Sequence, residues 1–235
     1  MLLSEAITMT LQRTGLSTTN TANVNQARLY LNAIANRIVG RAEWWWLFKS
    51  STLTTVANQR IYSLAADVQV PYSFTDQTNG QNLPFKGWNY FDAVDPEQDE
   101  TGDVGAVTIE GIDATTGYIV VALYPKHSTV SETIRYRYLA YIPDWTSTED
   151  TVNLDIHLPQ LLQPALYFGA AELYMQEKGD SEGAGENRDE YDSIIDIGLK
   201  TNLRVWGNRT WRRRGDENNG AEGFEFHVQE GSLSA

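Results

Sequence analysis

Few residues of this 235-residue chain have the types and spacing that metal binding requires. The histidines His127, His157 and His227 are far apart, and no pair has the spacing of a transition-metal site. The acidic run from Asp95 to Asp103 lacks the residue order of a calcium loop, so we interpret it as a solvated acidic loop. The absence of cysteine excludes disulfides and thiolate metal sites. The sequence therefore predicts no metal and no cofactor.

Glycoside hydrolysis is the enzymatic chemistry that the residues come nearest to supporting. It requires a carboxylic acid in an apolar pocket and a second carboxylate at a fixed distance. Glu43, which precedes a run of tryptophans, is the candidate acid, and no convincing second carboxylate accompanies it. The alternative is a helix-surface glutamate that pairs with Arg41, Lys49 or solvent. Phosphate-binding glycine loops and the Gly-x-Ser-x-Gly motif do not occur, so we predict that the protein is not an enzyme.

The strongest local signal is a basic and aromatic stretch near the C-terminus, WGNRTWRRRGDENN. It passes into GAEGFEFHVQEG, where apolar side chains alternate as in a strand. The candidate contact residues are Trp206, Arg209, Trp211, Arg212, Arg213, Arg214, Phe224 and Phe226. The stretch could bind nucleic acid, or it could lie along its own subunit. It could also be an arm that folds onto a partner protein, since Trp and Arg are typical interface anchors and alternating segments add to sheet edges.

The consecutive residues Trp44, Trp45 and Trp46 mark a change from helical to strand-like patterning. Neighbouring residues of a helix are about 100° apart, so these side chains cannot all share one face. One interpretation is a hinge core, with one ring in the helical part, one under the β part and one at the seam. A second is that one ring contacts a neighbouring subunit. A third is a platform for stacking carbohydrate.

Helical periodicity occupies both ends of the chain. In the second predicted helix Leu31 and Ile34 lie in the middle of the apolar stripe, so we predict that both are core residues. Gly40 lies inside the same helix, where we expect another backbone to approach closely. Pro164 should weaken or kink the third helix. The predicted helices span residues 3–14, 21–47, 158–178 and 187–206.

Strand patterns fill the middle of the chain. A hairpin is predicted from Thr52–Val56 and Arg60–Leu64, with Asn58 at positive φ in its turn. Further strands are expected at 106–110, 118–124 and 133–141, the first two joined by a turn at Asp113–Gly117. Residues 65–103 are interpreted as an irregular acidic loop with a short strand or two.

The predicted fold class is α+β. It comprises a four-helix bundle, with two N-terminal and two C-terminal helices, an inserted antiparallel β region and an extended C-terminal arm. The expected domains are 1–49 with 151–207 for the bundle and 50–150 for the β insertion. The arm, 208–235, is too polar and glycine-rich to fold alone.

The net charge of −13 limits the possible partners. It argues against tight wrapping of nucleic acid, which needs Lys and Arg to displace counterions, but it allows nucleic acid to slide past. The chain has no run of about 18 apolar residues, so no membrane span is expected. The start, MLLSEAITMTLQRTG, lacks the basic region and apolar run of a signal peptide.

Two stretches carry a resemblance to a known family. The first is NTANVNQARLYLNAIANRIVGRAEWWWLFKSSTLTTVANQRIYSLA, a helix followed by tryptophans and a predicted hairpin. The second is YRYLAYIPDW with HLPQLLQPALYFGAAELYMQEKGD, a closing strand followed by a helix. With the first and last helices, they resemble the head-to-tail adaptors of short-tailed bacteriophages, of the tail tubular protein A type, over about residues 4–206.

The resemblance implies a structural function without a cofactor. Family members form a ring, dodecameric in the family, between the portal protein and the tail nozzle protein, and tail fibres are a further candidate partner. The C-terminal extension reaches toward the portal, so the arm residues named above become candidate portal contacts. DNA would pass through an acidic lumen without specific binding, because carboxylates repel phosphates. The expected location is the head-to-tail junction of the virion, with host cytoplasm during assembly.

Two other functions remain open at this point. Some phage adaptors are reported to carry muramidase activity, which would require a carboxylate pair in a cleft. A receptor- or carbohydrate-binding tail module is suggested by the aromatic-rich β region. Such a module would show a row of exposed aromatic side chains on one face of a sheet.

Overall fold

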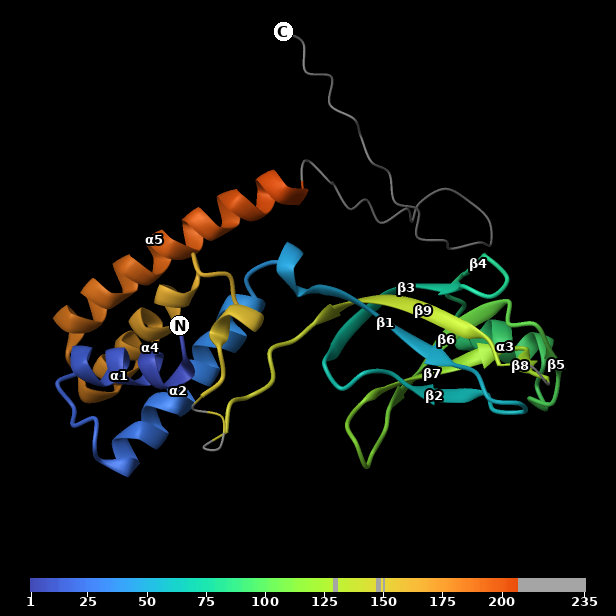
Figure 1. The fold of residues 1–235 in the computed structure, drawn as a ribbon, viewed down its shortest axis with the longest axis horizontal. Helices are drawn as coiled ribbons and strands as arrows, with labels where there is room; N and C mark the ends of the chain where they lie inside the picture. The colour runs from blue at the N-terminus through green and yellow to red at the C-terminus, as the bar shows by residue number, and fades with distance from the viewer. Residues whose placement is uncertain (129–130, 147–148, 150, 207–235) are drawn as a thin grey trace, which may run out of the picture. The chain divides into compact units, whose positions relative to one another are not determined.

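The computed structural model describes residues 1–128, 131–146, 149 and 151–206. These residues divide into two compact units (Figure 1). The first, helical unit lies within residues 1–46 and 141–206, and the second unit, which contains the strands, lies within residues 47–140. The chain therefore enters the second unit once and returns once to the first.

The helical unit is organised around one central helix. The helix α4 contacts each of α1, α2 and α5. The short 3-10 helix η2 (Leu154–Ile156) precedes α4, and a second, η1 (Trp45–Leu47), leads into the first strand. The bounds of the helices are α1 (Leu3–Arg13), α2 (Thr21–Val39), α4 (Gln163–Lys178) and α5 (Ser181–Trp206).

Helix α2 is shorter than its predicted range of 21–47. Asn20 caps its start by accepting a hydrogen bond from the backbone N–H of Ala22 at 2.9 Å. Gly40 is the C-cap and not an interior residue, so the expected close backbone approach there is wrong. The close approaches occur on other helices: a Cβ on Gly169 would lie 2.9 Å from Ile34, and one on Gly198 would lie 2.5 Å from Leu162.

Helices α4 and α5 also begin at other residues than predicted. Pro164 lies in the first turn of α4, where its missing N–H costs nothing, so it starts the helix and does not kink it. Gly179 ends α4 with φ +76°, at the residue after the predicted end of the helix. Residues 181–186, which lie between the predicted third and fourth helices, are the first turns of α5. There Asp180 accepts a hydrogen bond from the N–H of Gly183 at 3.0 Å, and Ala184 is buried.

The second unit contains three sheets. The first has the order β1-β9-β3-β4, the second β2-β7-β6, and the third pairs the short strands β5 and β8 in parallel. A short helix, α3 (Trp88–Val94), joins β4 to β5. The bounds of the strands are β1 (Phe48–Thr54), β2 (Ile61–Ser63), β3 (Val68–Asp76), β4 (Gln81–Leu83), β5 (Thr101–Gly102), β6 (Ala106–Ile112), β7 (Ile119–Tyr124), β8 (Lys126–His127) and β9 (Thr133–Ala140).

The predicted hairpin of residues 52–64 is wrong, although its turn is right. Asn58 has φ +63°, as expected, but β1 pairs with β9 and β2 pairs with β7. The two strands therefore leave the turn into different sheets. The predicted hairpin at Asp113–Gly117 is confirmed, because β6 pairs antiparallel with β7 and Gly117 has φ +73°.

An apolar cluster built from several strands forms the core of the second unit. Strand β9 contributes alternate side chains, with Ile134, Tyr136 and Tyr138 buried and Arg137 exposed, although the alternation ends at Leu139, which is also buried. The other buried members are Tyr62, Leu64, Val68, Phe74, Leu83, Val104, Val107, Val121, Leu123 and Ala140.

The predicted four-helix bundle is wrong as a description of this fold. The described residues contain five α-helices and nine strands in three sheets, and the class is α+β only in this broad sense. Two physical reasons account for the difference. Phe91 is buried on α3, which places a fifth helix in the second unit. In the first unit α4 is a central helix that α1, α2 and α5 each contact, and not one of four equivalent helices.

We predict that truncation of Leu31 destabilises the helical unit. Leu31 on α2 is fully buried, so Leu31→Ala should lower the free energy of unfolding by about 2–5 kcal/mol. Leu29→Ala is the matched control, because Leu29 lies on the same helix and is 68% exposed. Urea unfolding followed by circular dichroism measures both. Equal stability of the two variants would contradict the assignment of the α2 core face.

Candidate functional site

The three tryptophans have three different environments. Trp44 is buried, and its indole Nε1 donates a hydrogen bond to the carbonyl oxygen of Ile38 at 2.7 Å. Trp46 is half-buried with its ring 6.1 Å from that of Trp44. Trp45 is 42% exposed, so a large apolar side chain is presented to solvent. One ring thus packs in the helical core and one is free for an external contact, while the predicted hinge or interface role remains a prediction.

Asn202 on α5 holds this tryptophan segment in place. Its Oδ1 accepts a hydrogen bond from the backbone N–H of Trp45 at 2.9 Å, and its Nδ2 donates to the carbonyl oxygen of Glu43 at 3.1 Å. Sequence reasoning missed this residue. Its position, in register with buried Tyr191 and Ile195 on the inner face of α5, was the available signal.

A buried carboxylate links three helices of the first unit. Glu172 on α4 is 1% exposed and lies 3.3 Å from Arg37 of α2 and 2.8 Å from Arg188 of α5. Gln176 donates a further hydrogen bond to it at 2.9 Å. A buried charge is stable only when it is paired and hydrogen-bonded, so this ion network fixes how α2 and α5 meet α4. The sequence signal was a glutamate directly after the buried run at Ala170 and Ala171.

The second unit contains a cluster of buried ionisable side chains. Glu132, His127 and Asp76 are each 3% exposed or less. The Nδ2 of Asn79 donates to Glu132 at 2.8 Å and to Asp76 at 2.7 Å, so one amide bridges the two carboxylates. The His127 Nδ1 lies 3.5 Å from the Glu132 carboxylate. The backbone of Thr55 pairs with that of Glu132 and anchors the cluster to the end of β1.

Burial raises the pKa of Glu132, and the nearby Asp76 carboxylate adds to the rise. Interaction with His127 and the hydrogen bond from Asn79 oppose it. Elsewhere in the unit, a hydrogen bond to Glu100 raises the pKa of Tyr124 to about 12. These shifts follow from burial and from neighbouring carboxylates.

The described residues contain no group of three or more His, Cys, Asp or Glu side chains arranged to hold a metal ion. In the acidic loop after α3, the buried Asp95 carboxylate has hydrogen-bond partners within the loop. It accepts hydrogen bonds from the backbone N–H groups of Asp99 and Glu100. Of the remaining histidines, His157 lies against the Trp145 ring at 6.3 Å, and His227 is outside the described residues.

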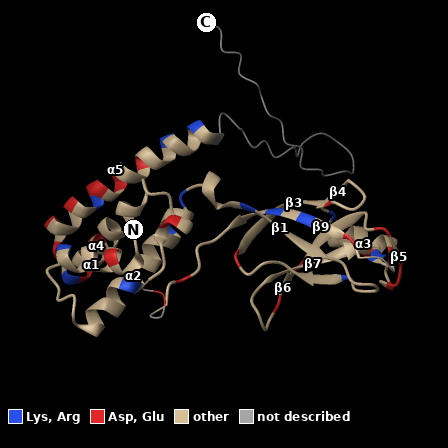
Figure 2. Ribbon diagram, in the orientation of Figure 1, with Lys and Arg blue, Asp and Glu red and all other residues tan. Residues whose placement is uncertain are grey.

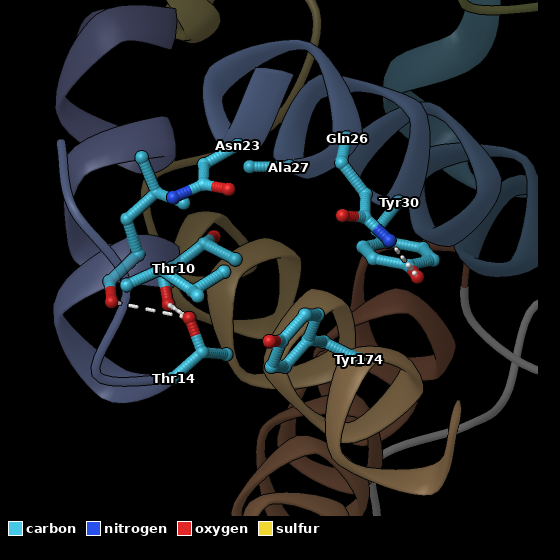
Figure 3. Close-up of a pocket in the computed structure, with 9 residues that line it drawn as sticks. Thr10, Thr14, Asn23, Gln26, Ala27, Tyr30 and Tyr174 are labelled. Carbon is cyan, nitrogen blue, oxygen red and sulfur yellow. Dashed lines mark hydrogen bonds between the residues drawn. The ribbon is translucent and has the colours of Figure 1, made fainter. Parts of the chain in front are cut away.

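A small hollow lies between α1, α2 and α4 in the helical unit (Figure 3). Thr10, Thr14, Asn23, Gln26 and Tyr30 are among its lining side chains, and Tyr174 lies opposite them. The space among these residues is about 170 Å³ including open solvent, and it is too narrow to enclose a small molecule. The Gln26 amide donates to the Tyr30 hydroxyl at 2.9 Å, so the polar groups partner each other.

A family model for the SU10 adaptor protein matches residues 1–214. The chain belongs to the SU10 adaptor protein family. Membership confirms the expected resemblance to phage head-to-tail adaptors. It gives this adaptor a structural role as a component of a phage virion that interacts with portal and tail proteins. No curated protein matches the chain.

The two alternative functions find little support in the geometry of the SU10 adaptor. Glu43, the candidate acid, is exposed and not enclosed in an apolar pocket. Among the described side chains, the exposed aromatic rings of the second unit are Trp88 and Tyr90 on α3 and Tyr118 beside a turn. On the sheets, Tyr136 and Tyr138 are buried. These exposed rings therefore do not form a row on one sheet face.

The candidate portal contacts of the adaptor begin at the end of α5. Trp206 is the last residue of α5. The others, Arg209, Trp211, Arg212, Arg213, Arg214, Phe224 and Phe226, lie outside the described residues. Among the described residues, no helix is both long enough and apolar enough to cross a membrane.

The raised pKa of Glu132 predicts how stability depends on pH. The unfolded chain releases this proton at a lower pH than the folded protein does. Between the two pKa values the folded state binds more protons, so the free energy of unfolding falls as pH rises through that window. Glu132→Gln removes this loss, and its melting temperature should exceed that of the parent near neutral pH and approach it at about pH 4.

The control for this experiment is Glu43→Gln, which makes the same change at an exposed carboxylate. Thermal unfolding over a pH series measures all three proteins. A Glu132→Gln variant that is less stable than the parent at neutral pH would show that His127 holds the carboxylate as an anion.

Proposed function

We propose that this chain is the subunit of a ring, dodecameric as in similar adaptors, that joins the portal protein to the tail nozzle of a phage. The observation that carries the proposal is the family match over residues 1–214, which includes both described units and the first residues of the arm. The ring acts as a channel for DNA and catalyses no reaction. Tail fibres are a further candidate partner.

Exposed apolar side chains of the helical unit support a role in assembly. Trp45, Leu203 and Val205 are 42%, 68% and 56% exposed, and the Trp45 backbone is bonded to Asn202 of the same helix end. Large apolar side chains that are exposed are candidates for contacts with other subunits. Leu203 and Val205 directly precede the arm, whose Trp, Arg and Phe residues we propose as the contacts to the portal.

The charge of α5 supports passage of DNA without binding. Its exposed residues include many Asp and Glu, and Figure 2 colours the Asp and Glu positions of the helix ribbon red. Carboxylates repel phosphates and cannot release the counterions that drive nucleic-acid binding. The exposed acidic residues are Glu182, Glu186, Asp189, Glu190, Asp192 and Asp196.

Removal of the arm should abolish docking and leave the folded units intact. Truncation after Gly207 deletes every proposed anchor except Trp206, and Trp211→Ala combined with Phe226→Ala should have most of the same effect. Co-sedimentation with DNA-filled heads measures docking, and mass photometry with and without the portal measures ring formation. Melting temperatures should change little, because a polar, glycine-rich arm is not expected to form a core of its own.

Two matched controls accompany these variants. Truncation after Glu230 removes only the last residues, and Asn218→Ala with Asn219→Ala changes polar residues of the same arm. Both should dock normally. Normal co-sedimentation of the chain truncated after Gly207 would contradict the proposed docking role of the arm. Loss of folding in this variant would show instead that the arm belongs to a core.

We also predict that the protein does not cleave peptidoglycan. Glu43 is exposed, and no carboxylate pair in an apolar pocket accompanies it in the described chain. Turbidity of purified cell walls incubated with the protein should therefore not fall. Lysis that is lost in Glu43→Gln, and kept in a neutral variant of exposed Glu186, would establish the muramidase function instead.

A further inference from the structure

One face of the four-stranded sheet combines arginine with small hydroxyl side chains. Side chains that lie directly opposite each other across an antiparallel ladder share a face of the sheet. Arg135 and Arg137 of β9 are the central residues of two such rows, between threonines in one and serines in the other. Ile134, Tyr136 and Tyr138 point to the opposite face, where they belong to the apolar core. The arginine face consists of Ser50, Thr52, Ser73, Thr75, Arg135 and Arg137.

The two arginines of this face have no ionic partner among the described residues. The ion pairs of the second unit involve other side chains, namely Lys49 with Asp67, Arg60 with Glu110, and His127 with Glu132. Arg137 is exposed and Arg135 is half-buried. Arginine binds a carboxylate through two parallel hydrogen bonds, and hydroxyl groups beside it can donate further ones. The arginine face therefore suits a partner that presents carboxylates.

The second unit also contains a segment of opposite charge. Residues 92–103, which we call the acidic segment, contain six acidic residues and no basic one. Asp95 is bound to the backbone of the segment, and Glu100 accepts a hydrogen bond from the Tyr124 hydroxyl. Figure 2 shows blue on the ribbon of β9 and red on the loop beside β5. The other acidic residues, which are exposed and form no ion pair within the described chain, are Asp92, Glu97, Asp99 and Asp103.

Exposed apolar side chains accompany both surfaces. Val70 of β3 is exposed and pairs with Leu139, in the row that follows Arg137 on the same face of the sheet. Trp88 of α3 is exposed and lies four residues before Asp92, so both are on one side of that helix. Protein interfaces combine an apolar centre with a polar and charged rim. Each surface therefore has the composition of a protein contact.

We propose that the arginine face of one copy binds the acidic segment of a neighbouring copy. Both surfaces belong to the second unit, so each copy offers one of each. A contact between two different surfaces repeats from copy to copy, and it closes into a ring when the rotation between copies allows. The inference rests on the proposed function, since it names the contact between neighbours in the proposed ring.

Charge favours a second copy over nucleic acid as the occupant of the arginine face. A chain with net charge −13 repels phosphates, and two arginines displace few counterions. The acidic segment supplies more exposed carboxylates than two arginines can bind, and it contains no lysine or arginine to compete for them. Complementary charges of this kind steer association and fix its register.

Complementary charge reversal tests the contact. Arg135→Glu with Arg137→Glu gives a copy whose two surfaces are both acidic, and Glu97→Lys with Asp99→Lys and Asp103→Lys gives one whose surfaces are both basic. Each variant alone should associate about tenfold more weakly than the parent, or weaker still, because like charges then meet. An equal mixture should recover association, since each reversed surface meets its opposite on the other variant. Analytical ultracentrifugation of the full chain without portal measures all four samples.

Three controls accompany these variants. Arg135→Lys with Arg137→Lys keeps the charge and should weaken association less than the reversal does. Asp189→Arg with Glu190→Arg changes exposed acidic residues of α5 and should associate like the parent. Thermal unfolding followed by circular dichroism checks that each variant is folded. The mixture is a further check, because an unfolded variant could not restore association.

Engineered cysteines test which surfaces meet, because the chain has no cysteine of its own. A Thr52→Cys chain mixed with an Asp99→Cys chain should form a disulfide between copies under mild oxidation, since a disulfide requires the two residues to come close together. Ile112→Cys replaces Asp99→Cys in the control mixture, because Ile112 is equally accessible on the β6–β7 hairpin. The control mixture should link far more slowly.

Several outcomes would overturn the proposed contact. They are an unlinked Thr52→Cys and Asp99→Cys mixture, no recovery when the two reversed variants are mixed, and loss of association in the α5 variant alone. Binding of the parent to duplex DNA that Arg135→Glu with Arg137→Glu abolishes would identify phosphate as the occupant instead.

The ring is tested separately, by mass photometry with the portal. If each reversed variant alone still forms a ring on the portal, the contact is wrong and the ring stands. If the parent forms no ring on the portal but gives the disulfide between copies, the ring is wrong and the contact stands. The two proposals can therefore be rejected independently.

Discussion

The helical unit depends on the pairing of one buried carboxylate. Glu172 lies at the centre of α4 with almost no exposure, and its charge is compensated by arginines from two other helices. Both arginines remain partly hydrated, so only the carboxylate bears the full cost of leaving water. The loss of either partner would leave a buried charge undercompensated. The network therefore specifies which helices surround α4, and the glycines that admit Ile34 and Leu162 set how closely they pack.

Local chemistry made part of the fold predictable. The apolar stripe of α2, the alternation along β9 and the positive φ of Asn58 each follow from a few neighbouring residues. The pairing of β1 with β9 cannot be predicted in this way, because β9 lies far along the chain and no local sequence pattern indicates which strand β1 pairs with. The predicted first residue of α5 was wrong for a related reason. The first turns of α5 look like a linker until Asp180 caps them and the burial of Ala184 adds packing energy.

The candidate site was less predictable than the fold. The three consecutive tryptophans were conspicuous in the sequence because of their composition alone. The buried position of Trp44 and the exposed position of Trp45 follow from the 3-10 helix η1, whereas the sequence predicted that α2 continued to residue 47. Asn202 and Glu172 act through partners on other helices, so a single sequence shows only that a polar residue falls on an apolar face. The residues expected to contact the portal were selected by type alone, since aromatic and arginine side chains anchor interfaces in many folds.

The pairing of β1 with β9 also has a mechanical consequence. The chain enters the second unit through Phe48 and leaves it through Ala140, and Phe48 lies opposite Leu139 in the ladder. A tensile load on the helical unit would therefore enter the sheet through two adjacent strands at once. Because β1 pairs with no other described strand, its share of the load passes to β9 through the bonds between these two strands. From β9 the load reaches the rest of the sheet as shear across the β9–β3 ladder, where several hydrogen bonds must break together.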